Sequence, residues 1–255
     1  MIALRGVGKR YTNRAGDTVV AVDGVTLDIG ADEFVTIVGA SGCGKSTLLK
    51  LIGGLIAPTM GQIVRGGTPV TGPSRDTGIV FQNPVLLPWR SVRDNVLFPV
   101  EILGGSRREY RAEADRLIAL VGLRGFENSI PRELSGGMQQ RVSICRALIH
   151  DPALLLMDEP FGALDAMTRE ELGMELLQVW SVRRKTVVFV THSIPEAILL
   201  ADRVVVMASR PGRIVAIIEI ALPRPRAIEM EFGQAFEGYS KAIRTAIADA
   251  RARVT

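Results

Sequence analysis

Residues 39–46 have the types and spacing of a phosphate-binding loop. They read G-A-S-G-C-G-K-S and match the pattern G-x-x-x-x-G-K-[ST]. Glycines let the backbone curl so that several N–H groups point at one anion. We expect Lys45 to reach the β- and γ-phosphates of a nucleotide, and the Ser46 hydroxyl to join the shell of a Mg²⁺ ion. The predicted nucleotide-binding residues here are Gly39, Ala40, Ser41, Gly42, Cys43, Gly44, Lys45, Ser46 and Thr47.

A second stretch supplies two carboxylates. The apolar run Leu154–Met157 is followed directly by Asp158 and Glu159. On its own, such a run could be a buried strand that ends in a solvated acidic turn. With a phosphate loop upstream, we expect Asp158 to hold Mg²⁺, directly or through water, and Glu159 to act as general base toward the attacking water. Together the two stretches predict a hydrolase of Mg-nucleotides.

Continuous apolar runs predict the strands that position these residues. Such runs are typical of a sheet that is covered on both faces, and one of them, Phe34–Val38, leads through the phosphate loop into a helical pattern. A strand–loop–helix unit of this kind predicts a parallel α/β sheet. The predicted buried strands are Phe34–Val38, Leu154–Met157, Val187–Val190 and Val204–Met207.

Two further regions differ from this core. Short β-like pieces at Ile2–Leu4, Val19–Val22 and Val25–Ile29 predict a small, mainly antiparallel sheet. Residues 91–150 carry a helical pattern, in which apolar side chains recur at helical spacing from Tyr110 to Val121. The sequence therefore predicts a helical subdomain inserted in the α/β core, and a further helix near the C-terminus, at about 232–254.

The composition excludes several classes of protein. Of the 255 residues, 47% are hydrophobic and 23% charged, which is ordinary globular usage and argues against disorder. Aromatic residues make up 5%, too few for a surface that stacks single-stranded nucleic acid. A helix needs about 18 apolar residues to span a bilayer, and no apolar run approaches that length. The N-terminus lacks the apolar region of a secretory signal. The two cysteines have no metal-binding spacing and fit a reducing compartment.

Residues 134–141, which read L-S-G-G-M-Q-Q-R, resemble the signature sequence of ABC-transporter ATPases. Other elements of that family follow the same order along the chain. Tyr11 resembles the adenine-stacking aromatic, Gln82 the glutamine of the Q-loop, and His192 the switch histidine. Residues 162–165, G-A-L-D, resemble the D-loop. The resemblance adds His192 to Lys45 and Glu159 as catalytic residues, and Gln82 to Ser46 and Asp158 as Mg²⁺ ligands.

The signature also has a physical reading. A Ser-Gly-Gly run at the start of a helix offers free N–H groups, a hydroxyl and a helix dipole, which together favour an anion. The resemblance implies a head-to-tail dimer in which Ser135, Gly136 and Gly137 contact the γ-phosphate held by the other subunit's Lys45. The sequence has Met138 where glutamine is usual, and we keep that residue in the nucleotide-binding set.

Residues 81–96, F-Q-N-P-V-L-L-P-W-R-S-V-R-D-N-V, resemble the ATPases of nitrate, sulfonate and taurine importers. In ABC importers a cytoplasmic coupling helix of the permease docks in this region. We therefore expect permease docking near Gln82–Val96, with Leu86, Leu87 and Trp89 on the surface. The alternative is that these three side chains pack internally.

The resemblance implies an α/β fold of the P-loop NTPase (RecA-like) type with a parallel-sheet core. Residues 1–225 are expected to form the ATPase domain, with the helical subdomain at about 91–150 inserted in it, and residues 226–255 a C-terminal helical tail. The cofactors would be ATP and Mg²⁺. The partners would be permease subunits, a second ATPase copy and, indirectly, a substrate-binding protein, with no nucleic acid. The protein would lie peripherally on the cytoplasmic face of the inner membrane.

Three other functions remain open from the sequence. The same ATPase role could serve another cargo, such as bicarbonate or a vitamin precursor. A soluble ABC-type ATPase acting on nucleic acid would usually carry a long coiled-coil insertion or two cassettes, and neither is present. A non-catalytic interaction subunit would not need an intact set of Lys45, Asp158, Glu159 and His192.

Overall fold

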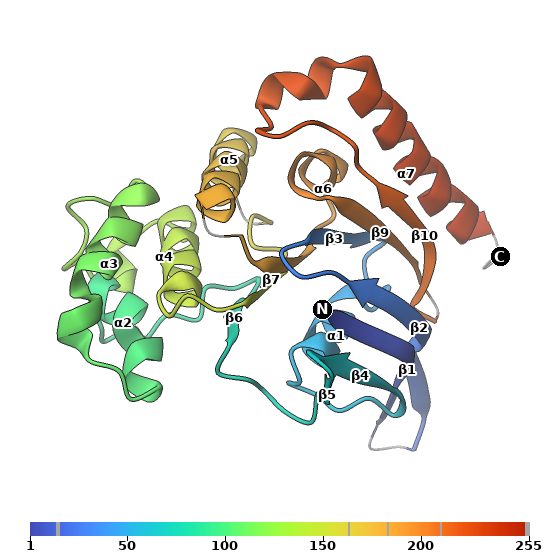
Figure 1. Ribbon diagram of the computed structural model, residues 1–255, viewed down its shortest axis with the longest axis horizontal. Helices are drawn as coiled ribbons and strands as arrows, with labels where there is room; N and C mark the ends of the chain where they lie inside the picture. The colour runs from blue at the N-terminus through green and yellow to red at the C-terminus, as the bar shows by residue number, and fades with distance from the viewer. Residues whose placement is uncertain (14–15, 163, 183, 210, 253–255) are drawn as a thin grey trace. The chain divides into compact units, whose positions relative to one another are not determined.

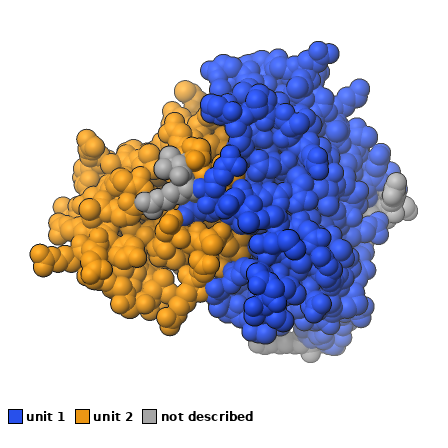
Figure 2. Space-filling view, viewed as in Figure 1, with its two compact units in different colours: residues 1–74, 184–255 blue, residues 75–183 orange. Residues whose placement is uncertain are grey.

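The computed structural model describes residues 1–13, 16–162, 164–182, 184–209 and 211–252. The chain forms two compact units, drawn in blue and orange in Figure 2. Unit 1 contains residues 1–74 and 184–255, and unit 2 contains residues 75–183. Ala163 of the expected D-loop and Arg210 lie outside the described residues.

An antiparallel sheet forms the first layer of unit 1. Its strands lie in the order β2-β1-β4-β5, and alternate side chains such as Leu4 and Leu27 are buried. The sequence predicted two pieces between Val19 and Ile29, but β2 is one strand, so that prediction was wrong. The register against β1 shifts near Gly24, which has φ 60°, and this irregularity accommodates the glycine without ending the strand. The strands are β1 (Ile2–Thr12), β2 (Thr18–Ile29), β4 (Met60–Arg65) and β5 (Thr68–Pro69).

A second sheet of unit 1 contains three of the predicted apolar runs. Strand β3 pairs in parallel with β8 and β9, and β10 pairs antiparallel with β9. The helices α1, α6 and α7 contact these strands, and Figure 1 shows α7 running beside β10. The elements are β3 (Phe34–Gly39), α1 (Lys45–Ile52), β8 (Thr186–Val190), α6 (Ile194–Leu200), β9 (Arg203–Ala208), β10 (Arg213–Glu219), the 3₁₀ helix Ile228–Phe232 and α7 (Gln234–Ala252).

Unit 2 combines two parallel strands with a group of helices. Strands β6 (Thr77–Val80) and β7 (Leu154–Asp158) pair in parallel. The predicted helical segment contains α2, α3 and α4, with α2 in contact with the other two. The helices are α2 (Val92–Ile102), α3 (Arg107–Leu120), the 3₁₀ helix Pro131–Glu133, α4 (Gly136–Leu148) and α5 (Ala166–Val182).

These elements confirm the predicted α/β class, with parallel strands, an antiparallel sheet at the N-terminal side and a helical segment between two core strands. Within the described ranges, no helix is long and apolar enough to cross a bilayer.

Candidate active site

The phosphate loop lies between β3 and α1 in unit 1. Gly42 and Gly44 have φ values of 74° and 90°, a backbone region that L side chains rarely adopt. A Cβ atom on Gly44 would also lie 2.6 Å from the carbonyl oxygen of Ala21. The tight turn into α1 therefore requires glycine at this position.

Lys45 begins α1 and is buried, with 5% of its surface exposed. Its Nζ donates to the carbonyl oxygens of Gly39, at 3.0 Å, and Ala40, at 3.2 Å. The ammonium group is thereby held against the loop at the N-terminal end of a helix, where the helix dipole also favours an anion. Ser46 and Thr47 follow in the first turn of α1 and are half-buried, while Cys43 is buried within the loop.

His192 follows strand β8, which is the parallel neighbour of β3. Ile37 pairs with Val190 in the register, and Thr191 donates its N–H to the carbonyl of Ile37 at 3.1 Å. Because the carboxyl ends of parallel strands share one edge, the exposed His192 and the phosphate loop that follows β3 lie at the same edge of the sheet. Unit 1 therefore brings together two of the residues predicted to be catalytic, Lys45 and His192.

Tyr11 lies near the end of β1 and is 43% exposed. The ammonium of Lys9 lies 5.4 Å from the centre of its ring and also donates to the carbonyl of Ala57 at 2.7 Å. A partly exposed aromatic ring next to a cation can stack on a planar base.

Unit 2 brings together the acidic strand end and Gln82. Strands β6 and β7 are parallel, with Val80 opposite Met157. Gln82 comes shortly after the end of β6 and Asp158 is the last residue of β7, so both lie at the same edge of the sheet. Asp158 is 7% exposed. Glu159 adopts φ 44°, which is uncommon for a residue other than glycine and is found preferentially at functional sites.

The signature residues form the start of α4. The Ser135 side chain caps the helix by accepting the N–H of Met138 at 3.3 Å, and Ser135 and Gly136 are exposed. A cavity of about 480 Å³ opens here, between the first turn of α4 and residues 164–168, which include the end of the D-loop. It is lined by Gly122, Leu123, Phe126, Ser135, Gly137, Met138, Arg141, Leu164, Asp165 and Thr168.

Asp165 is fixed at the rim of this cavity by Thr168. The backbone N–H of Thr168 donates to Asp165 at 3.0 Å and its hydroxyl at 2.7 Å. These bonds lower the pKa of Asp165 because they favour the ionised carboxylate. The signature and the described part of the D-loop thus meet in unit 2, in one cavity with a fixed negative charge.

The segment before α2 presents apolar side chains to solvent. Trp89 is 76% exposed, Val85 60% and Phe81 36%. The alternative of internal packing is therefore wrong for Trp89, while Leu86 and Leu87 are half-buried. We call Phe81, Val85 and Trp89 the apolar patch.

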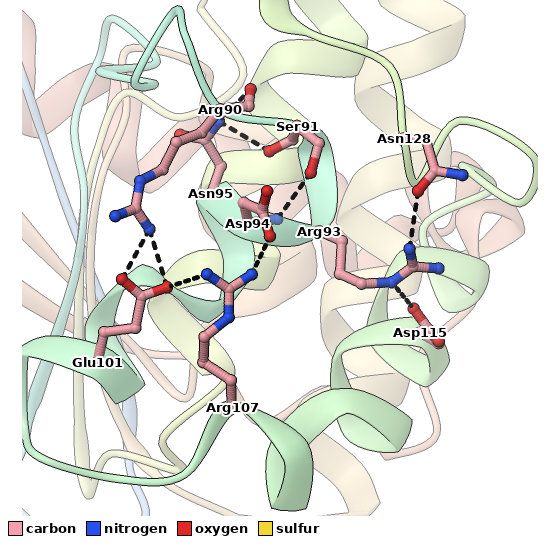
Figure 3. A network of polar contacts seen from close by, with 9 residues as sticks. All are labelled: Arg90, Ser91, Arg93, Asp94, Asn95, Glu101, Arg107, Asp115 and Asn128. Atoms are coloured by element: carbon pink, nitrogen blue, oxygen red, sulfur yellow. Dashed lines mark hydrogen bonds and ion pairs between the residues drawn. The ribbon is translucent and has the colours of Figure 1, made fainter.

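Asn95 of α2 holds this segment in place, as Figure 3 shows for Arg90 and Ser91. The side chain is fully buried. Its Nδ2 donates to the carbonyls of Leu87, Arg90 and Ser91 at 3.0–3.1 Å, and its Oδ1 accepts the Leu87 N–H at 2.7 Å. The loop that carries Trp89 is thus tied to α2 by directed hydrogen bonds.

Ion pairs add to this support (Figure 3). Glu101 accepts from Arg90 at 2.8 Å and from Arg107 at 2.8 Å, and Arg107 also contacts Asp94. The Arg90 guanidinium lies 4.9 Å from the ring centre of Phe98. The sequence analysis includes Arg90, Asp94 and Asn95 only as part of the resemblance carried by residues 81–96, and it predicts a supporting role for none of them. The residue that could have indicated this support is Asn95, in the helix after the patch. A sequence does not show whether such an asparagine is buried or exposed, so it gave no usable signal.

Comparison with known proteins gives one family. The family described as ABC transporter matches residues 22–162. A taurine import ATP-binding protein of Rhizobium johnstonii is 50% identical over 84% of this chain and 82% of its own. An uncharacterized ABC transporter ATP-binding protein of Methanocaldococcus jannaschii is 52% identical over 83% of this chain and 79% of its own. A solved dimeric ATP-binding cassette in a post-hydrolysis state with ADP and phosphate superposes with a TM-score of 0.79, at 33% identity, over 88% of this chain and 100% of that chain.

Proposed function

Since this chain belongs to the ABC transporter family, as an ATP-binding subunit of the nitrate, sulfonate and taurine type, we propose that two copies of it energise uptake of a small oxyanion or sulfonate. ATP hydrolysis coupled to transport is the activity of such subunits. The observation that carries the proposal is the placement of polar groups at strand ends, with Lys45 and His192 at one edge in unit 1 and Gln82, Asp158 and Glu159 at one edge in unit 2.

Each residue then has a role that its chemistry supports. Lys45 and the loop N–H groups bind the phosphates of ATP, and Tyr11 stacks on adenine. Glu159 takes a proton from the attacking water, and His192 contacts the γ-phosphate. Mg²⁺ fits the donor set, since the Ser46 hydroxyl, the Gln82 amide oxygen and the Asp158 carboxylate are the hard oxygen ligands that this ion prefers. When bound, the ion would neutralise charge on the phosphates.

A head-to-tail dimer would use the second anion site. The exposed Ser135 and Gly136 lie at the start of α4, where the first N–H groups of a helix have no partner within the helix, and the cavity beside them has room for part of a ligand. The signature of one copy would contact the γ-phosphate on the other copy, so that two ATP molecules close the interface. The solved cassette named above is described as dimeric, which supports this assembly.

The apolar patch supports docking of a permease. Trp89, Val85 and Phe81 expose apolar area on a loop that is held firmly, as expected for a surface that receives a partner. The ATPase would then lie peripherally on the cytoplasmic face of the membrane. The relatives named as taurine import proteins favour a sulfonate as cargo, because taurine is a sulfonate. Bicarbonate or a vitamin precursor remains the second candidate.

The test of the hydrolytic part is the substitution Glu159→Gln. We expect this variant to bind ATP, to lose phosphate release and to form an ATP-dependent dimer in size-exclusion chromatography. Lys45→Ala serves as the contrast, since it should lose ATP binding as well. Phosphate release by Glu159→Gln at the wild-type rate would show that Glu159 is not the base.

The test of the transport part uses the tagged protein captured from detergent-solubilised native membranes. We expect a multi-span permease to be captured with it. The binding protein that pairs with that permease can then be screened with taurine, nitrate, bicarbonate and alkyl sulfonates. Capture of nucleic acid or of soluble proteins alone would contradict the importer role and leave the ATPase chemistry in place.

A further inference from the structure

Two arginines before α7 bind the end of helix α6. A helix leaves its last four carbonyl groups without partners inside the helix. Arg226 donates to the carbonyls of Ile198, Leu199 and Ala201, at 2.9, 3.0 and 2.6 Å. Arg224 donates to the carbonyl of Leu200 at 2.9 Å. The two side chains therefore supply donors to the last three carbonyls of α6 and to the carbonyl of Ala201, the residue that caps its C-terminal end.

Arg226 makes these bonds from a buried position. It is 5% exposed, and its remaining acceptor in the part of the chain that the structure describes is the carbonyl of Ile220, at 3.2 Å. Burial, and then the positive charge of Arg224, lower the pKa of Arg226 to about 10, so it is charged at neutral pH. A buried charge that bonds only neutral carbonyls is costly to maintain. An apolar side chain would avoid this cost but would leave the carbonyls at the end of α6 without these donors, so packing alone does not account for an arginine here.

The opposite, N-terminal end of α6 lies directly after the predicted switch histidine. His192 immediately precedes Ser193, which caps the helix. Thr191 fixes this end, because it donates to Glu196 at 2.5 Å and accepts the Ser193 N–H at 2.9 Å. Since α6 has only seven residues, the two ends lie about 10 Å apart, and one short rigid element joins them.

Two more contacts connect α6 and the residue that follows Ala201 to β3, the strand that leads into the phosphate loop. Thr36 of β3 donates its hydroxyl to the carbonyl of Ala197 at 3.3 Å, near the middle of α6. Asp202 accepts the Phe34 N–H at 2.9 Å and pairs with Arg224 at 2.8 Å. The C-terminal end of α6 is thus fixed to the start of β3, the strand that leads into the phosphate loop.

We propose that Arg226, assisted by Arg224, is a positioning residue for His192, and that it acts through helix α6. By holding the C-terminal end of α6, the arginine pair fixes where the helix begins and therefore where the histidine lies relative to β3. This proposal rests on the role assigned to His192 under the proposed function. It makes the segment after β10 part of the catalytic apparatus of the ATPase.

The experiment compares Arg226→Gln, Arg226→Lys, His192→Ala and the control Arg244→Gln in the full-length protein. Arg244 is an exposed arginine of α7 whose guanidinium donates a long hydrogen bond, of 3.4 Å, to the Ser240 hydroxyl. We measure kcat and KM for ATP hydrolysis, ATP dissociation constants and hydrogen exchange of residues 191–200. Because misplacement of a catalytic group by about 1 Å can cost up to about 100-fold, we expect Arg226→Gln to lower kcat at least about 10-fold. The KM for ATP should change less than about 2-fold.

Three further results are expected from positioning. Arg226→Lys should recover part of kcat, because an ammonium still donates to carbonyls. Exchange at residues 193–196 should rise in Arg226→Gln and not in Arg244→Gln. The double variant with His192→Ala should have the same kcat as His192→Ala alone, since residues that act through one group are not additive.

Two outcomes separate the two hypotheses. A normal kcat for Arg226→Gln beside an impaired His192→Ala would overturn the positioning role and leave the proposed function intact. A normal kcat for His192→Ala would overturn the role of the histidine itself. If Arg226→Gln does not fold, Arg224→Gln, which removes a partly exposed side chain, carries the same test with an expected loss in kcat of about 3-fold, and an unchanged kcat would again overturn the proposal.

Discussion

Replacing Asn95 by leucine removes the bonds that hold the Trp89 loop while keeping a side chain of similar size. The two N–H protons of the Asn95 amide are shared by three carbonyls, and its oxygen accepts one N–H, which amounts to three full hydrogen bonds. At about 1 kcal/mol net for each bond, the free energy of unfolding should fall by about 3 kcal/mol. For a chain of this length that corresponds to a melting temperature lower by roughly 6–12 °C.

Urea unfolding followed by circular dichroism measures this loss. The matched control is Asn128→Leu, because Asn128 belongs to the same network (Figure 3) but is exposed, and among the described residues its side chain bonds only Arg93, at 2.9 Å. That control should stay within about 0.5 kcal/mol of the wild-type protein. Trypsin cleavage after Arg90 should also be faster in Asn95→Leu, since the loop is released. If Asn95→Leu unfolds at the wild-type urea concentration, the loop is held by something other than Asn95.

Three further predictions follow from exposure and burial. Trp89→Asp should keep stability within about 0.5 kcal/mol and leave ATP affinity unchanged, because Trp89 is 76% exposed, but it should lose the captured permease; retained capture would contradict docking at the patch. Ser135→Arg should still bind ATP as a monomer but lose turnover, and lose about 1 kcal/mol of stability with the helix cap; normal phosphate release would contradict the dimer. Burial raises the pKa of the Cys145 thiol, so a thiol reagent at pH 8 should modify Cys145 only after unfolding. Above about pH 9 the free energy of unfolding should fall as pH rises, because only the unfolded chain ionises this thiol.

The parts of the fold that the sequence predicted correctly have local causes. The runs at Phe34–Val38 and Leu154–Met157 are continuous and apolar, so burial on both faces follows from their composition, and both are strands. Strand β2 was predicted less well for a tertiary reason. Asp23 and Gly24 look like a break, but pairing with β1 through irregular register keeps the strand continuous.

The supporting residues of the site could not be predicted, because their partners are carbonyl groups. Every residue of the chain has the same backbone carbonyl, so the sequence carries no sign of which one a side chain reaches. Arg226 bonds carbonyls 25 to 28 residues away, and in the sequence it is part of a Pro-Arg-Pro-Arg stretch that indicates only a break in secondary structure. Lys45 is different, since the spacing of its own loop defines its surroundings.

Asn95 and Arg226 illustrate why a buried polar side chain can be kept at a functional surface. Each is at most 5% exposed, and each uses its donors on backbone carbonyls. Asn95 bonds the loop that presents the exposed Trp89, and Arg226 bonds the C-terminal end of α6, the helix that follows the exposed His192. Apolar packing is not directional, so it can bury such a segment without fixing its orientation. Hydrogen bonds lose strength when their angles change, so they fix orientation as well as position. Docking would require Trp89 to be held in one orientation, and hydrolysis would require the same of His192. This requirement explains why the desolvation cost of burying Asn95 and Arg226 is tolerated.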